Sequence, residues 1–113
     1  MPFVNDRKQL ALLLNAVTNR ELAFRDRETA AEEISERFDP KRHGKLFADA
    51  LARDDLTDPA RETLIDILAL MADEHSLAAL EAFVTATNRS TLLRNEAYLR
   101  LVALGRVKPR ARA

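Results

Sequence analysis

The chain has 113 residues, the length of a single domain, and its 47% apolar and 32% charged residues are those of a soluble globular protein. It contains no cysteine, which excludes disulfides, zinc–thiolate sites and cysteine nucleophiles. The net charge is zero, but residues 1–88 hold 11 Lys/Arg against 17 Asp/Glu, whereas residues 89–113 hold 7 Lys/Arg against 1 acid. Such an asymmetry indicates an interaction tail.

The composition favours helices over a hairpin-rich fold. Ala, Leu, Glu and Arg are good helix formers, and two Gly and four Pro leave few turns. The N-terminus lacks the apolar core of a signal peptide, and no run approaches the ~18 apolar residues of a membrane span. We expect an all-α cytoplasmic protein without a membrane segment, with one domain over residues 1–105 and a flexible basic tail over residues 106–113.

Asp6 can cap a first predicted helix that runs to about Thr18, and apolar residues recur within it at the spacing of one helical face. Residues 19–25 stay ambiguous, because Leu22 and Phe24 can either extend this helix or cover the core as a loop. We favour a break before Asp26, which would cap the next helix.

The second predicted helix, residues 27–38, has a narrow apolar stripe and an acidic face. Asp39 and Pro40 then combine a cap with a proline in the first turn, which predicts a third helix to about Arg53. Gly44 weakens the first turn of that helix by roughly 1 kcal/mol relative to Ala.

A helix–turn–helix unit is expected over residues 58–88. Asp58 and the proline after it repeat the cap–proline signal and open a fourth helix, whose wide apolar arc predicts burial on most sides. Asp73 marks the turn and can cap a fifth helix. Ser90 can cap a sixth, which would end before Gly105.

An internal repeat supports these helices. The triplet Arg27-Glu28-Thr29 recurs at Arg61-Glu62-Thr63, an offset of 34 residues, and Arg94 begins a truncated third copy 33 residues after Arg61. Further positions match at the offset of 34: Asp39 with Asp73, Ile34 with Leu68, Leu46 with Leu80, and Ala48 with Ala82.

The unit at residues 58–88 resembles a HEAT repeat of the short bacterial type. In that family a proline opens the first helix, an arginine follows two residues later, an aspartate marks the turn, and a leucine-rich helix follows. The residues that carry the resemblance are Pro59, Arg61, Leu64, Leu68, Asp73, Leu80 and Phe83. The resemblance implies a short α-solenoid of about six helices arranged as stacked antiparallel pairs.

The same resemblance implies a non-catalytic binding module, a protein–protein adaptor or regulator. Its expected surface is formed by residues 41–53 and 75–87. No motif indicates a catalytic site, a cofactor or a metal. We expect both His43 and His75 to be surface residues, and the acidic run at 54–58 lacks the Gly and Glu of a calcium-binding loop.

The last predicted helix is apolar on nearly all sides, although the end helix of a solenoid should be polar outside. Three explanations stay open: the tail folds over it, a second copy packs on it, or another partner does. We hypothesise a homodimer through a surface made of Leu92, Tyr98, Leu99, Leu101 and Val102.

The alternative function is nucleic-acid binding by the basic C-terminal segment, because phosphate contacts need only Lys and Arg. A basic cluster at the start of the third helix is a second candidate for anion binding. The candidate contacts are Arg100, Arg106, Lys108, Arg110, Arg112, Lys41, Arg42 and Lys45. The acidic remainder of the chain argues against this function, and the basic residues can instead meet the acidic helix of a neighbouring copy, around residues 28–36.

Overall fold

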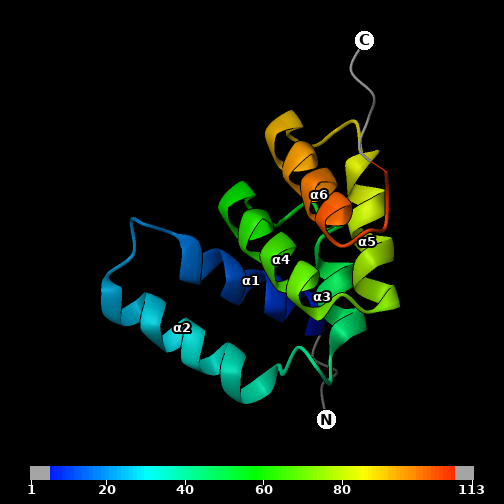
Figure 1. Cartoon of the computed structure of the whole chain (residues 1–113). Helices are drawn as coiled ribbons and strands as arrows, with labels where there is room; N and C mark the ends of the chain where they lie inside the picture. The colour runs from blue at the N-terminus through cyan, green and yellow to red at the C-terminus, as the bar shows by residue number, and fades with distance from the viewer. Residues whose placement is uncertain (1–5, 109–113) are drawn as a thin grey trace.

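The computed structural model describes residues 6–108, and over these residues the chain is helical without any strand. The prediction of an all-α protein is confirmed (Figure 1). Six helices are present in the described part: α1 (Asp6–Thr18), α2 (Phe24–Arg37), α3 (Gly44–Ala50), α4 (Asp58–Met71), α5 (Glu74–Val84) and α6 (Thr91–Ala103). None of them is long and apolar enough to cross a membrane.

The break between α1 and α2 lies earlier than predicted. Asn19 turns the chain, because its side-chain oxygen accepts a hydrogen bond from the Glu21 N–H (3.0 Å) and its carbonyl accepts one from Leu22 (3.2 Å). α2 therefore begins at Phe24, and the favoured start after Asp26 is wrong. The Phe24 side chain is 75% exposed, so it does not cover the core.

The third helix is much shorter than predicted. Asp39 does not cap a helix but closes a turn: its carboxylate accepts from the Lys41 N–H (3.0 Å), and its carbonyl accepts from Arg42 and His43. The helix starts only at Gly44 and ends at Ala50.

Gly44 is needed where it stands because α3 approaches the turn between α4 and α5. A Cβ atom at this position would lie 2.8 Å from Asp73 Oδ2 and 3.1 Å from the Met71 side chain. The glycine that weakens the isolated helix thus permits close packing in the folded protein.

From α4 onwards, three of the four predicted helix termini are confirmed. Asp73 caps α5 by accepting from the Ser76 N–H (2.7 Å), and Ser90 caps α6 by accepting from the Leu93 N–H (3.4 Å). Gly105, at φ 73°, ends α6. The predicted cap Asp58 is wrong: the residue before it, Thr57, accepts from Ala60 N–H, and Asp58 is the first helical residue.

Three arginines repeat one contact along the chain. Arg27, Arg61 and Arg94 are each the fourth residue of their helices, α2, α4 and α6. Each guanidinium donates to a backbone carbonyl that precedes its helix, at Val17 (3.2 Å), Arg53 (2.9 Å) and Val84 (2.9 Å). The sequence repeat therefore has a physical counterpart, in which an arginine ties the start of every second helix to the end of the segment before it.

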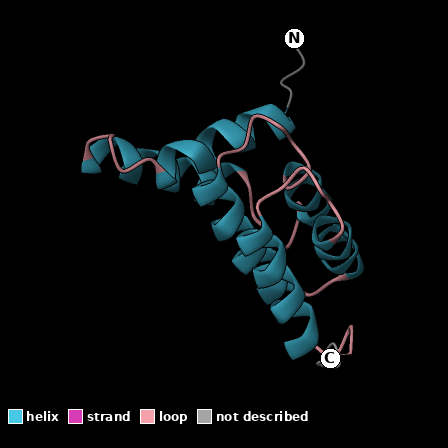
Figure 2. Ribbon diagram, turned by 90° about the horizontal axis from the view of Figure 1, so that it is seen from above, coloured by secondary structure: helices cyan, strands magenta, loops and turns pink. Residues whose placement is uncertain are grey.

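The helices differ in how completely they are surrounded. α4 contacts α1, α3, α5 and α6, and its Leu64, Ile65 and Leu68 are fully buried. α2 contacts α1 and no other helix, and only Ala30 within it is buried. Figure 1 shows α1 lying between α2 and α4, and Figure 2 shows the α1–α2 hairpin projecting to one side of the remaining helices.

Candidate binding site between α2 and α4

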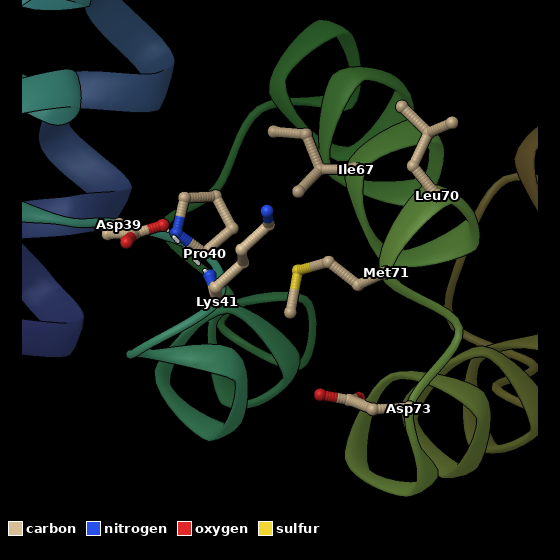
Figure 3. Close-up of a pocket in the computed structure, with 7 residues that line it drawn as sticks. All are labelled: Asp39, Pro40, Lys41, Ile67, Leu70, Met71 and Asp73. Atoms are coloured by element: carbon tan, nitrogen blue, oxygen red, sulfur yellow. Dashed lines mark hydrogen bonds between the residues drawn. The ribbon is translucent and has the colours of Figure 1, made fainter.

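α2 and α4 make no contact with each other. The surface formed by Ile67, Leu70 and Met71 of α4 and by the α2–α3 connection at Asp39, Pro40 and Lys41 is called the α2–α4 valley below. At the C-terminal end of α4 it contains an open hollow of about 560 Å³. Figure 3 shows the side chains that line it: Ile67, Leu70 and Met71 from α4, Asp39, Pro40 and Lys41 from the α2–α3 connection, and Asp73.

The α4 side of this hollow is apolar and poorly covered. Leu70 is 87% exposed, and Ile67 and Met71 are only partly buried. These residues follow the i, i+3, i+4 spacing of one helical face. The expectation that α4 is buried on most sides is wrong for this face, because α2 does not pack against it.

The polar groups around the hollow are mostly acidic. Hydrogen bonds from Ser76 hold the pKa of the Asp73 carboxyl below its usual range, so this residue is ionised at neutral pH. Asp39 keeps one carboxylate oxygen free of the turn bond to the Lys41 N–H. In Figure 3 the Lys41 side chain extends towards Ile67 and Met71, so its stem covers part of the apolar floor.

A second hollow, of about 720 Å³, lies at the other end of α4, against the end of α1 and the connection at residues 19–22. Asn15 holds the two helices together here: its side chain donates to the Asp55 carbonyl (2.8 Å) and accepts from the Thr57 N–H (2.9 Å). Glu62 of α4 borders this hollow and, within residues 6–108, forms no ion pair.

The exposed side of α2 is acidic. Glu28, Glu32 and Glu36 are exposed, and among the described residues none of the three has an ion-pair partner. Only Glu33 is paired, with Arg37 one turn later at 3.2 Å. The side of α2 that points away from α1 therefore carries unneutralised negative charge.

The residues of the predicted dimer surface on α6 differ in how exposed they are in the structure. Leu92 and Leu99 are 78% and 51% exposed, as a partner surface requires. Leu101 is 1% exposed and belongs to the core, because it lies on the face that packs inward, so its assignment as a partner residue is wrong. Tyr98 and Val102 are partly buried.

The chain after α6 folds back over one side of that helix. The Tyr98 hydroxyl donates to the Lys108 carbonyl (3.1 Å), and Val107 packs against the core. Arg106 forms ion pairs with Glu74 (3.1 Å) and Glu81 (3.0 Å). The first three residues of the expected tail, 106–108, are thus attached to α5 and α6.

The predicted nucleic-acid contacts do not form one free basic surface. Arg100 bonds to Asp66 of α4 (2.6 Å) and to Glu96 (3.2 Å), and Arg106 is paired as described. Lys45 pairs with Asp49 (3.0 Å). Of the others, Lys41 lines the hollow, Arg42 and Lys108 are exposed, and Arg110 and Arg112 lie outside the described residues.

The surface predicted over residues 41–53 and 75–87 corresponds to α3 and α5. Two shallow hollows of about 350 and 600 Å³ run along it and share small residues, Ala48, Ala52 and Ala79. Of the histidines, His75 is exposed and borders one hollow. His43 is partly buried, with its ring 6.0 Å from that of Phe38.

Within residues 6–108 no three His, Asp or Glu side chains come together in a way that could hold a metal ion. Comparisons of the chain with protein families, with characterised proteins and with solved structures find no match.

Sequence reasoning missed Ile67, Leu70 and Met71 as site residues. One signal in the sequence could have indicated them. Leu70 is a large residue at the edge of an apolar arc on this helix, and the arc is wider than packing against one neighbouring element requires.

Proposed function

We propose that the chain is a non-catalytic protein-binding module, an adaptor or regulator, which holds its partner in the α2–α4 valley. The observation that carries this proposal is the 87% exposure of Leu70 on an apolar helix face that no other helix covers. Apolar surface left open to water, beside a hollow and rimmed by charged residues, is typical of a site for another protein.

The proposed architecture is a short HEAT-like α-solenoid. The pairs α1–α2, α3–α4 and α5–α6 would be its repeats, with α2, α4 and α6 in one layer and α1, α3 and α5 in the other. The repeated arginine contact and the packing of α4 on α6, α1 on α3 and α3 on α5 support this arrangement. The valley is then the one place where neighbours in a layer stay apart.

Affinity capture with the whole chain tests the proposal. Leu70→Asp should abolish recovery of the partner without unfolding the protein, because the side chain is already in water. Leu104→Asp is the matched control, since Leu104 is 43% exposed at the end of α6, outside both the valley and the surface of Leu92 and Leu99. A direct partner, confirmed with purified proteins, that binds Leu70→Asp as well as wild type would disprove this site.

We also propose self-association through α6, because Leu92 and Leu99 lie two turns apart on its exposed side. Sedimentation at high micromolar concentration should give a dimer that Leu92→Asp converts to monomer. A monomeric wild type would exclude it. Nucleic-acid binding has weaker support, because Arg100 and Arg106 already have carboxylate partners.

A further inference from the structure

We infer that the α2–α4 valley of one molecule receives helix α6 of a second copy, with Leu92 and Leu99 of that α6 packed against Ile67 and Leu70 of α4. This inference rests on the proposed binding function of the valley and on the proposed self-association of α6, and it makes these surfaces the two sides of one contact. Two features support it: the repeat of the chain and the chemistry of the two surfaces.

Each of the two surfaces is an apolar helix face that the chain leaves uncovered. In α4, Leu70 is 87% exposed beside the hollow that Ile67 and Met71 line. In α6, Leu92 and Leu99 are 78% and 51% exposed and lie on one face, because seven residues make about two helical turns. Large apolar side chains that gather in this way are typical of surfaces that bind protein.

The contact of α4 with α6 within one chain shows how helices of this repeat pack. The two helices lie side by side and run in the same direction, as the colours of Figure 1 show. Asp66 of α4 bonds to Arg100 of α6 (2.6 Å), which marks the side that each helix turns towards the other. We call the side of Asp66 on α4 the forward side of a helix, and the side of Arg100 on α6 its backward side.

The repeat transfers these two sides between α4 and α6. The arginines that bond to preceding carbonyls from α4 and α6 stand 33 residues apart, so residues at this offset hold matching places on the two helices. Leu99 therefore lies on the forward side of α6, in the place of Asp66, and Ile67 lies on the backward side of α4, in the place of Arg100. Within residues 6–108 no further helix follows α6, and α2 makes no contact with α4.

The side chains of the two open sides match each other. Inside one chain the contact joins opposite charges, Asp66 and Arg100. If α6 packs in the same way on α4 of a second copy, the residues at the corresponding places are Leu99 and Ile67, and both are apolar. Such packing removes the exposed leucines of α6 and α4 from water, which stabilises the contact.

The charges at the ends of the two surfaces are opposite. In a parallel packing the C-terminal ends of α6 and α4 come together. α6 is followed by the exposed Lys108, and by Arg110 and Arg112, which lie outside the described residues. Of the charged residues that line the hollow at the end of α4, two are acidic, Asp39 and Asp73, and one is basic. The resulting attraction favours the parallel direction and weakens with salt.

The contact joins two different surfaces, so it is not symmetric. After binding one neighbour, a copy still has one open surface, and association can continue into larger species. A single contact between two helices buries less surface than a standard protein interface. We therefore expect a weak association that is visible at high micromolar concentration.

Complementation between two variants tests the inference. Leu70→Asp removes the valley side of the contact and keeps α6, whereas Leu92→Asp removes the α6 side and keeps the valley. Both side chains are already largely in water, so both variants should fold. In sedimentation velocity at high micromolar concentration, wild type should form dimers, and larger species as the concentration rises. Each variant alone should associate at least about tenfold more weakly.

An equal mixture of the two variants should recover dimers but no larger species, because it contains one intact surface of each kind. Leu104→Asp is the control for both variants. It makes the same change five residues after Leu99, on another side of α6, at a side chain that is 43% exposed. Its association should stay within about twofold of wild type, and circular dichroism should show all three variants folded.

The other outcomes overturn the inference in different ways. If either variant alone associates as wild type does, the surface that it retains pairs with itself. If the mixture contains no more dimer than the separate variants, the valley and α6 do not meet. A wild type that stays monomeric excludes both the inference and the self-association of α6, but leaves the valley as a proposed site for another protein. That site is defeated only by a direct partner that binds Leu70→Asp as well as wild type.

Discussion

α2 and α4 are built alike and surrounded differently. Both have 14 residues, and both carry an arginine as the fourth residue that donates to a preceding carbonyl. Yet α4 is packed between four other helices, whereas α2 touches only α1. The repeat therefore determines the local construction of a helix but not its burial. Burial depends instead on the contacts with other helices, which α4 makes with α1, α3, α5 and α6 and α2 makes with α1 alone.

The largest difference is expected for a pair of core residues at matching positions, Leu68 of α4 and Ile34 of α2. Leu68 is fully buried, so Leu68→Ala should lower the free energy of unfolding by about 2–5 kcal/mol. Ile34 is only partly buried, so Ile34→Ala should cost roughly half as much. Chemical denaturation followed by circular dichroism measures both. Equal costs would show that α2 is packed as firmly as α4.

The next largest difference in stability is expected between two arginines at matching positions, Arg61 of α4 and Arg27 of α2. Arg61 is 7% exposed and bonds to both Asp58 (2.9 Å) and the Arg53 carbonyl, so Arg61→Ala should cost about 1.5–3 kcal/mol. Arg27 makes one bond, to the Val17 carbonyl, at a partly buried position. Arg27→Ala should therefore cost only about 0.5–1.5 kcal/mol. Denaturation curves of the two variants decide this, and a larger loss for Arg27 would contradict the comparison.

A smaller difference is expected for the aspartates that follow the two helices. Asp73 caps α5, so Asp73→Ala should cost about 1 kcal/mol. Asp39, at the matching position, stabilises only an exposed turn, so Asp39→Ala should cost less than about half of that. Thermal melting of both variants provides the measurement. Similar losses would mean that the turn after α2 matters as much as a helix cap.

The smallest effect concerns pH. The pKa of Asp73 is lowered on folding by hydrogen bonds from Ser76, so its contribution is complete above the unfolded pKa of about 3.9 and is lost as pH falls through the folded pKa. Asn also caps helices but does not titrate. Asp73→Asn should therefore match wild type near pH 7 and lose less stability below about pH 4. Parallel losses in the two proteins would contradict this assignment.

Much of the helical construction could be predicted from local patterns. The caps at Asp73 and Ser90 and the stop at Gly105 depend on a few neighbouring residues, and the structure confirms them. The errors occur where two local signals compete. Asp39 followed by a proline is a cap signal, but the aspartate also closes a turn with its own next residues, and the turn prevails.

The candidate site was much less predictable, because the sequence does not show which residues a hydrophobic side chain will contact in the folded protein. Leu70 and Leu101 look alike in the sequence, but one is 87% exposed and the other 1%. The basic residues gave a similar difficulty. Arg100 was a candidate for nucleic acid, and its actual partner Asp66 lies 34 residues away in a separate helix.

The sequence by itself determined that this protein is all-α, how its helices repeat and where most of them end, because those properties depend on propensity, capping and periodicity within a few residues. Only the tertiary structure decided which helix faces are covered. That depends on distant parts of the chain: Arg100 of α6 bonds to Asp66 of α4, whereas α2 makes no contact with α4, and Leu70 stays exposed.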